Sequence, residues 1–212
     1  MKGITFGDVH SYRDLRLILG KKEIGSPPVK ERKTDIEGAD GYLDHTEFFG
    51  EAKFENAVHK FEFSTTVPQE EFLSQYSMAK NALHGKKVRV ILDDDPNFYY
   101  IGRLKVSPFT SEKAVGSLSV EADCEPYKYN LEKTIVQQTI SGSAAITLTN
   151  GRKRVVPEIT TTSPMTISFG GGSWSASAGT FRIPELELVQ GENVVGVTGT
   201  GTITFTYQEG NL

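Results

Sequence analysis

The sequence predicts a mainly β protein of two domains, of which the first carries one α-helix and a long irregular segment. Three observations lead to this prediction. Short stretches of alternating apolar and polar residues recur along the whole chain. Only one stretch, residues 68–84, follows a helical period. The density of charged residues also falls sharply near residue 130.

Length and composition limit the classes of protein to consider. The 212 residues suffice for one large or two small domains. A mean hydropathy of −0.32 and the lack of a long apolar run give no membrane segment. The amino terminus has no apolar core of a signal peptide, so synthesis without export is expected. A net charge of −4 without a basic stripe argues against nucleic-acid recognition.

The charge distribution places a domain boundary at residue 130. Residues 1–130 contain 18 Lys and Arg and 21 Asp and Glu, whereas residues 131–212 contain 5 and 6. All four histidines also precede the boundary. Beyond it, Ser, Thr, Gly, Ile and Val predominate. We therefore predict domains at 1–130 and 131–212.

The first domain begins with short strands and a long interruption. Strands are expected around Ile4–Phe6 and Leu15–Leu19, and again over residues 58–67. Between them, residues 21–50 lose all periodicity but keep an apolar load that a solvated linker would not need. Two interpretations stay open for this segment: a disordered linker, or an ordered arm that docks on a neighbouring subunit. The candidate interface residues of such an arm are Ile36, Asp40, Tyr42, Phe48 and Phe49.

The helix of the first domain is followed by a β-hairpin. Apolar residues at positions 72, 76, 79 and 83 form one helical stripe, and Gly85 is suited to end it. Two alternating strands, 88–92 and 98–106, enclose the polar turn at Asp93–Asn97. A further strand, 117–124, ends at Cys124. Because one helix cannot cover both faces of a sheet, an antiparallel sandwich or barrel-like sheet is expected.

The second domain reads as a small β-sandwich or jelly roll, because eight short strands follow each other at regular spacing. Glycine and asparagine turns separate them. The predicted strands are Thr134–Thr139, Ala145–Thr149, Val155–Thr160, Met165–Phe169, Thr180–Ile183, Glu185–Val189, Asn193–Thr198 and Thr202–Tyr207.

The sequence offers no catalytic, cofactor or metal motif, so we expect neither an enzyme nor a bound cofactor. The residues Asp93, Asp95 and Asn97 resemble the start of a calcium loop, but Phe98 and Leu104 occupy positions that the loop needs for Gly and Glu. A polar turn is therefore favoured. Cys124 and His59 are expected to be buried structural residues of alternating strands.

Trp174, the single tryptophan, admits two interpretations. An exposed tryptophan in a small β-sandwich can stack on a sugar ring, whereas most tryptophans are largely buried. The buried role is favoured, and Trp174 remains the one candidate residue for sugar stacking.

The order of these features resembles the distal tail (Dit) protein family of long-tailed, non-contractile bacteriophages. The resemblance covers residues 1–130. It rests on the opening Ile4–Gly7, the glycine turn at Ile36–Gly41, the helix ending Asn81–Gly85, the hairpin Val88–Tyr100 and the closing strand Ala122–Tyr129. The second domain resembles, by its strand pattern, the galectin-like β-sandwich that many members append.

The resemblance implies a structural role at the virion tail tip, in a protein made in the bacterial host cytoplasm. Family members form a hexameric ring that joins the tail tube protein to the tail-associated adhesion or lysin protein and to receptor-binding components. Sugar binding is not implied, because residues 131–212 lack the histidine of a galectin site. Two alternatives remain open, a carbohydrate-binding β-sandwich for host adhesion and a tail-tube-like protein.

Overall fold

The structure is a computed structural model that describes residues 2–48, 50–112 and 115–212. The chain divides into two compact units, Met1–Lys128 with Leu212, and Tyr129–Asn211. The sequence places the division at residue 130. Among the described residues, no helix has the length and apolar character that crossing a membrane requires.

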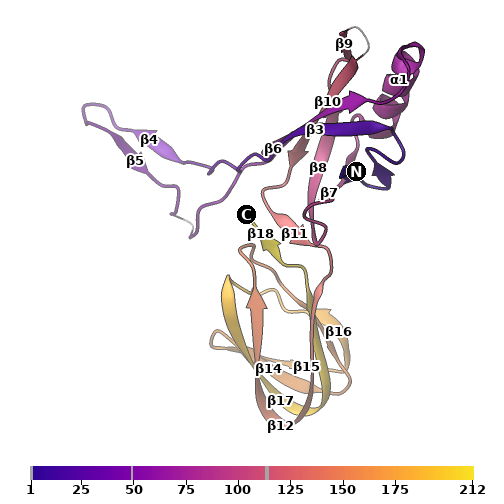
Figure 1. Ribbon diagram of the computed structural model, residues 1–212. Coiled ribbons are helices and arrows are strands. Elements are labelled where there is room, and N and C mark those ends of the chain that lie inside the picture. Colours follow the sequence, from indigo (N-terminus) through magenta and orange to yellow (C-terminus); the bar gives the residue numbers. More distant parts are fainter. Residues whose placement is uncertain (1, 49, 113–114) are drawn as a thin grey trace. The chain divides into compact units, whose positions relative to one another are not determined.

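The first unit is built on one antiparallel sheet (Figure 1). Its strands are β1 (Ile4–Phe6), β2 (Val9–His10), β3 (Leu17–Glu23), β6 (Ala57–Thr65), β7 (Lys87–Leu92), β8 (Phe98–Val106), β9 (Thr110–Glu112) and β10 (Val115–Cys124). They run in the order β2-β1-β7-β8-β10-β6-β3, and β9 pairs with β10. The sheet thus confirms the predicted antiparallel architecture.

The helix α1 (Phe72–Leu83) follows a short 3-10 turn, Gln69–Glu71, and covers one face of this sheet. Its buried side chains include Phe72, Ala79 and Leu83, as the helical stripe predicts. Gly85 follows the helix with φ +79°, a conformation that costs glycine no steric strain.

The two faces of the sheet differ because residues alternate along each strand. Phe61 and Phe63 of β6 are at most 2% exposed, whereas their neighbours Lys60 and Glu62 are exposed. Phe61 lies opposite the buried Val120 of β10. Such an aromatic side chain gains about 1.5–3 kcal/mol from burial, so this face is the core of the first unit.

A separate hairpin interrupts the sheet between β3 and β6. It consists of β4 (Lys33–Asp35) and β5 (Tyr42–Asp44), which pair only with each other. Figure 1 shows it extending to the left, away from the strands of the main sheet. The described residues of the irregular segment therefore include a β-hairpin, which we call the arm.

The second unit is a curled antiparallel structure around two long strands. Its strands are β12 (Thr134–Asn150), β13 (Glu158–Thr161), β14 (Met165–Phe169), β15 (Gly172–Ala176), β16 (Gly179–Arg182) and β17 (Gly191–Tyr207). Two short strands, β11 (Lys128–Asn130) and β18 (Gly210–Asn211), pair with each other. The order is β15-β14-β17-β13-β16, with β12 on the other side of β17. Its core includes Ile146, Leu148, Ile159, Val197 and Phe205.

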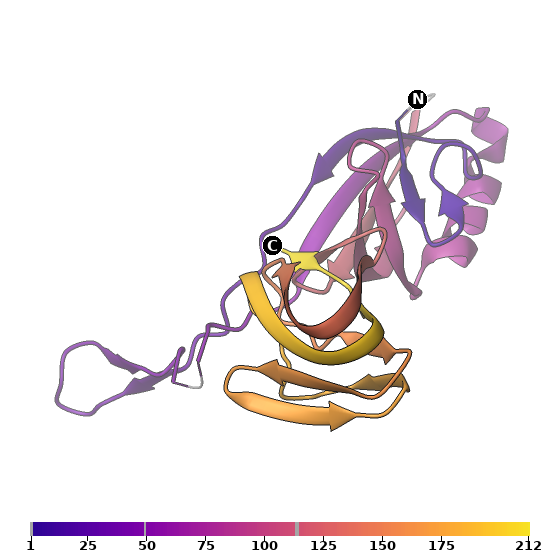
Figure 2. The same cartoon turned by 90° about the horizontal axis from the view of Figure 1, so that it is seen from below.

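The two long strands correct the prediction of four short ones. Strands β12 and β17 pair without interruption over 17 residues each. Gly142 lies opposite Gly199, and both have positive φ values, +96° and +151°. These glycines let the ribbon bend without ending it, and Figure 2 shows its curvature. Gly199 and Gly201, which the sequence indicates as a turn, therefore lie at a bend inside β17.

The second unit differs from the prediction in two further ways: one predicted strand is wrong and one observed strand is not predicted. Residues Glu185–Val189 do not form a strand; Leu186 and Leu188 are fully buried, and Leu188 makes one isolated bridge with Val155. Conversely, the sequence does not predict β15, which pairs with β14 across a glycine turn. The alternation of apolar and polar residues at 185–189 results from burial of the leucines in the core and not from strand pairing.

Candidate interaction surfaces

The arm between β3 and β6 is held by backbone hydrogen bonds along its length. At its root, the Lys30 N–H donates to the Lys53 carbonyl (2.7 Å) and the Glu55 N–H donates to the Pro28 carbonyl (2.8 Å). Further out, the His45 N–H donates to the Arg32 carbonyl at 2.7 Å. A two-stranded ribbon of this kind has no core of its own, so its side chains are available to another surface.

The outer part of the arm presents apolar side chains to solvent. Tyr42 is 69% exposed, Phe48 is 73% exposed and Ile36 is 47% exposed. Asp40 is exposed in the turn between the two strands. Phe49 lies outside the described residues. The structure thus places four of the five candidate interface residues on one arm: the exposed apolar Ile36, Tyr42 and Phe48, and the exposed carboxylate Asp40.

The exposed surface of the arm also includes residues that the sequence did not single out. Leu43, Val29 and Ile24 are each 41–49% exposed. No buried face accompanies them, so no alternating pattern revealed the strand that holds Leu43. The sequence indicates this exposed surface only through the high apolar content of residues 21–50, a segment that has no periodicity.

The root of the arm is fixed to the sheet by a buried histidine. His59 on β6 is 1% exposed, and its Nδ1 accepts a hydrogen bond from the Gly25 N–H at 3.1 Å. Burial lowers the pKa of His59, so the imidazole stays neutral at neutral pH. A Cβ at Gly25 would come within 2.4 Å of the Val58 carbonyl oxygen, which makes glycine necessary for this close approach.

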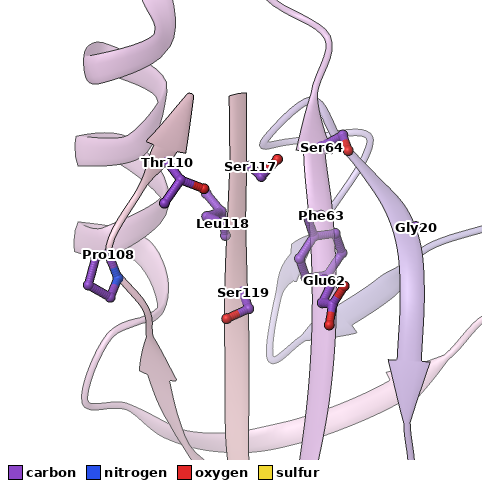
Figure 3. Close-up of a pocket in the computed structure, with 9 residues that line it drawn as sticks. All are labelled: Gly20, Glu62, Phe63, Ser64, Pro108, Thr110, Ser117, Leu118 and Ser119. Carbon is purple, nitrogen blue, oxygen red and sulfur yellow. The ribbon is translucent and has the colours of Figure 1, made fainter. Parts of the chain in front are cut away.

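A shallow groove of about 350 Å³ crosses the polar face of the first sheet (Figure 3). Its polar lining consists of four hydroxyl side chains and one carboxylate: Ser64, Thr110, Ser117, Ser119 and Glu62. The Ser119 hydroxyl donates to the Ser107 hydroxyl at 2.7 Å. Neither histidine nor cysteine lines the groove, and the one ionisable side chain in its lining is the exposed Glu62.

The acidic turn between β7 and β8 is neutralised by basic partners. Asp93 accepts from the His10 imidazole at 3.1 Å and from the Gly3 N–H at 2.8 Å. Asp94 pairs with Lys22, and Asp95 pairs with Lys128 at 3.0 Å. Each carboxylate therefore connects the turn to another segment of the first unit, which supports the prediction of a structural turn.

Asp93 gives the first unit a predictable sensitivity to acid. Burial alone would raise the pKa of Asp93, but the hydrogen bonds from His10 and Gly3 outweigh it and lower the pKa. The stabilisation is therefore present above the ordinary value of 3.8 and is lost as the pH falls through the folded-state value. We expect Asp93→Asn to cost about 1–2 kcal/mol at neutral pH. Melting curves from neutral to acid pH should show this loss shrinking below about pH 4; a loss independent of pH would contradict the assignment.

Cys124 is a buried thiol of low reactivity. It is fully buried on β10, and burial with the nearby Asp123 and Glu125 charges raises its pKa to about 12. The Gly102 position lies so close that a Cβ there would meet its Sγ at 2.5 Å. A thiol of this pKa is protonated at neutral pH and does not act as a nucleophile.

Trp174 is partly buried and packs against the core of the second unit. It lies opposite Ile167, which is fully buried, and its ring occupies the space beside Gly172. This packing favours a structural role.

The role of Trp174 is testable with one variant. Trp174→Ala should lower the melting temperature of the second unit by several degrees, because it removes aromatic packing from the core edge. A glycan array probed with the wild-type protein tests the alternative: sugar-dependent binding that the variant loses would assign Trp174 to a sugar site.

Within the described residues, these features define a class of protein: a two-unit antiparallel β protein with one α-helix and a projecting arm. Comparison with solved structures gives a particular match. The fold is that of Dit (gp 19.1) of phage SPP1, whose crystal structure is described as a paradigm of the hub adsorption apparatus in phages that infect Gram-positive bacteria. The TM-score is 0.70 at 13% identity, over 98% of this chain and 99% of that chain. No protein-family model and no curated protein sequence matches this chain. The predicted resemblance to the Dit fold is confirmed.

Proposed function

We propose that this protein is a structural subunit of the tail tip of a long-tailed, non-contractile phage or prophage. The observation that carries the proposal is the combination of a Dit fold over 98% of the chain with an arm whose aromatic side chains are exposed. The SPP1 protein belongs to a hub of an adsorption apparatus. A hub needs contacts between its own subunits and contacts with other tail proteins. The arm offers a surface for the contacts between subunits.

In the proposed assembly, six copies form a closed ring. The arm of one copy docks on the neighbouring copy, so that two different surfaces meet at each contact. Such a heterologous contact closes into a ring when its rotation fits a cyclic symmetry. Burial of Ile36, Tyr42 and Phe48 in this contact supplies the driving force.

The ring joins the tail tube protein on one side to the tail-associated adhesion or lysin protein and the receptor-binding components on the other. The protein acts in the virion tail tip, after synthesis in the cytoplasm of the bacterial host. Its role is assembly and not catalysis. The buried Cys124, whose raised pKa keeps the thiol protonated, supports this view.

Sedimentation velocity of the purified protein tests the proposal. We expect one species of the mass of a closed homo-oligomer, whose size stays constant as the concentration rises. A ladder of sizes that grows with concentration would instead indicate an open chain of subunits. A single monomeric species at high concentration would contradict self-assembly of the ring.

A further inference from the structure

The inner half of the arm has two faces of opposite charge. Residues of an extended segment alternate between the faces, so Lys30 and Arg32 lie on one face and Glu31 and Lys33 on the other. The linings of two cavities agree with this alternation. One, of about 210 Å³, is lined by Lys30, Arg32, Lys53, Glu51 and Thr46, and the other by Glu31, Asp44, Glu47, Thr46, Val29 and Ala52.

The basic face holds two lysines that oppose each other across the ribbon. Val29 bridges Phe54, and the Lys30 N–H donates to the Lys53 carbonyl, so Lys30 and Lys53 occupy facing positions on adjacent strands. Like charges at facing positions are destabilising. Within the described part of the chain, neither ammonium group forms an ion pair. Glu51 is the single carboxylate among the five residues that line this cavity, so the basic face carries a surplus of positive charge that an external anionic surface would complement.

The acidic face matches this requirement. Glu31, Asp44 and Glu47 carry three negative charges there, and Lys33, which binds Glu31 at 2.7 Å, carries one positive charge. Its net charge is thus −2. On the basic face, three cations and Glu51 give +2. Hydrogen bonds from the Thr46 hydroxyl and backbone N–H lower the pKa of Asp44, so its carboxylate stays charged at neutral pH.

We propose that the basic face of each arm stacks on the acidic face of the arm of the next copy. The partner is a second copy of this chain, because the two faces on one arm carry equal and opposite charge. The contact is head-to-tail, because a basic face pairs with an acidic face and not with another basic face. This inference rests on the ring proposed above. The exposed aromatic residues contribute apolar contacts, while the two charged faces set the direction and register of stacking.

Charge reversal of each face tests this inference. One variant combines Lys30→Glu with Lys53→Glu, which makes both faces acidic. A second combines Glu31→Lys with Glu47→Lys, which makes both faces basic. Each alone should weaken self-association at least about tenfold at low salt, because like charges then meet at every contact. A matched control, Glu132→Lys with Glu185→Lys, changes the net charge as the second variant does but alters exposed residues of the second unit, outside the arm, and should assemble like the wild type.

Mixing the two reversed variants gives the decisive result. An acidic arm and a basic arm alternate in a head-to-tail series, so an equimolar mixture should recover assembly that neither variant shows alone. Recovery also shows that both variants are folded. The four changes combined in one chain swap the faces, keep the wild-type net charge, and should restore assembly.

Sedimentation velocity at low and high salt reads out each case. The wild-type association should weaken as salt rises, since exposed charges are screened. If both reversed variants assemble like the wild type, or if the mixture fails to recover assembly, the stacking of charged faces is wrong while the ring stands. If the wild type itself is monomeric at low salt, the proposed ring is wrong.

Discussion

Replacing both Tyr42 and Phe48 with alanine is expected to abolish the proposed self-assembly and leave monomers, without lowering the melting temperature. These side chains are 69% and 73% exposed, so their removal takes little packing from the folded chain. Within the arm, the Lys33 ammonium lies 5.9 Å from the centroid of the Tyr42 ring, and the centroids of the His45 and Phe48 rings are 6.2 Å apart. In a ring, by contrast, the same side chains would be buried.

The expected loss is large because aromatic residues dominate the energy of most interfaces. An aromatic anchor at the centre of an interface contributes about 2–4 kcal/mol when truncated, so two of them weaken each contact by more than about a thousandfold. Sedimentation velocity and thermal unfolding of the same samples check both halves of the prediction. Leu73→Ala on α1 is the matched control, since Leu73 is 72% exposed and lies outside the arm. A double variant that assembles as the wild type does would remove the arm from the interface.

Phe61→Ala is expected to have the largest effect on stability. Phe61 is fully buried on β6, and its ring meets Phe6 edge to face at a centroid distance of 5.9 Å. Truncation of a buried phenylalanine costs about 3–5 kcal/mol, because the apolar contacts are lost and a cavity remains. A domain has only about 5–15 kcal/mol of stability in total, so the first unit should unfold well below its wild-type temperature.

The same variant tests whether the two units are separate domains. The cores around Phe61 and around Phe205 are built from different segments of the chain. Calorimetry of Phe61→Ala should therefore show the transition of the first unit shifted and that of the second unit unchanged. Val58→Ala, at a neighbouring position that is 47% exposed, should shift neither. One transition that moves as a whole would show that the chain unfolds as a single cooperative body.

Local periodicity explains why the centre of the first unit could be predicted. The helix at Phe72–Leu83 and the strands β7 and β8 follow from residues that are neighbours in sequence, so the pattern contains the information that positions them. The apolar stripe and the glycine at position 85 set the length of the helix. Burial of Cys124 follows in the same way from the alternation of β10.

Long-range pairing explains the errors in the second unit. Whether a glycine ends a strand or bends it depends on the residue opposite. The pairing of Gly142 with Gly199, 57 residues later, is not visible in either segment alone. Similarly, Leu186 and Leu188 alternate because both enter the core, although their segment pairs with no strand beyond one bridge.

The arm was identified by its composition but its structure was not predicted. Strands β4 and β5 are exposed on both faces, so they leave no alternating pattern. The five candidate residues are apolar and turn residues of an irregular segment. Their shared exposure in a hairpin, and the charged faces nearer the root, required the three-dimensional structure.

Negative-stain electron microscopy of the purified protein tests the central claim most directly. The proposed function predicts closed rings of six copies around a central channel, and the Tyr42→Ala, Phe48→Ala double variant should show none. Uniform single particles of monomer size in the wild-type sample, at concentrations where sedimentation detects no larger species, would contradict the claim.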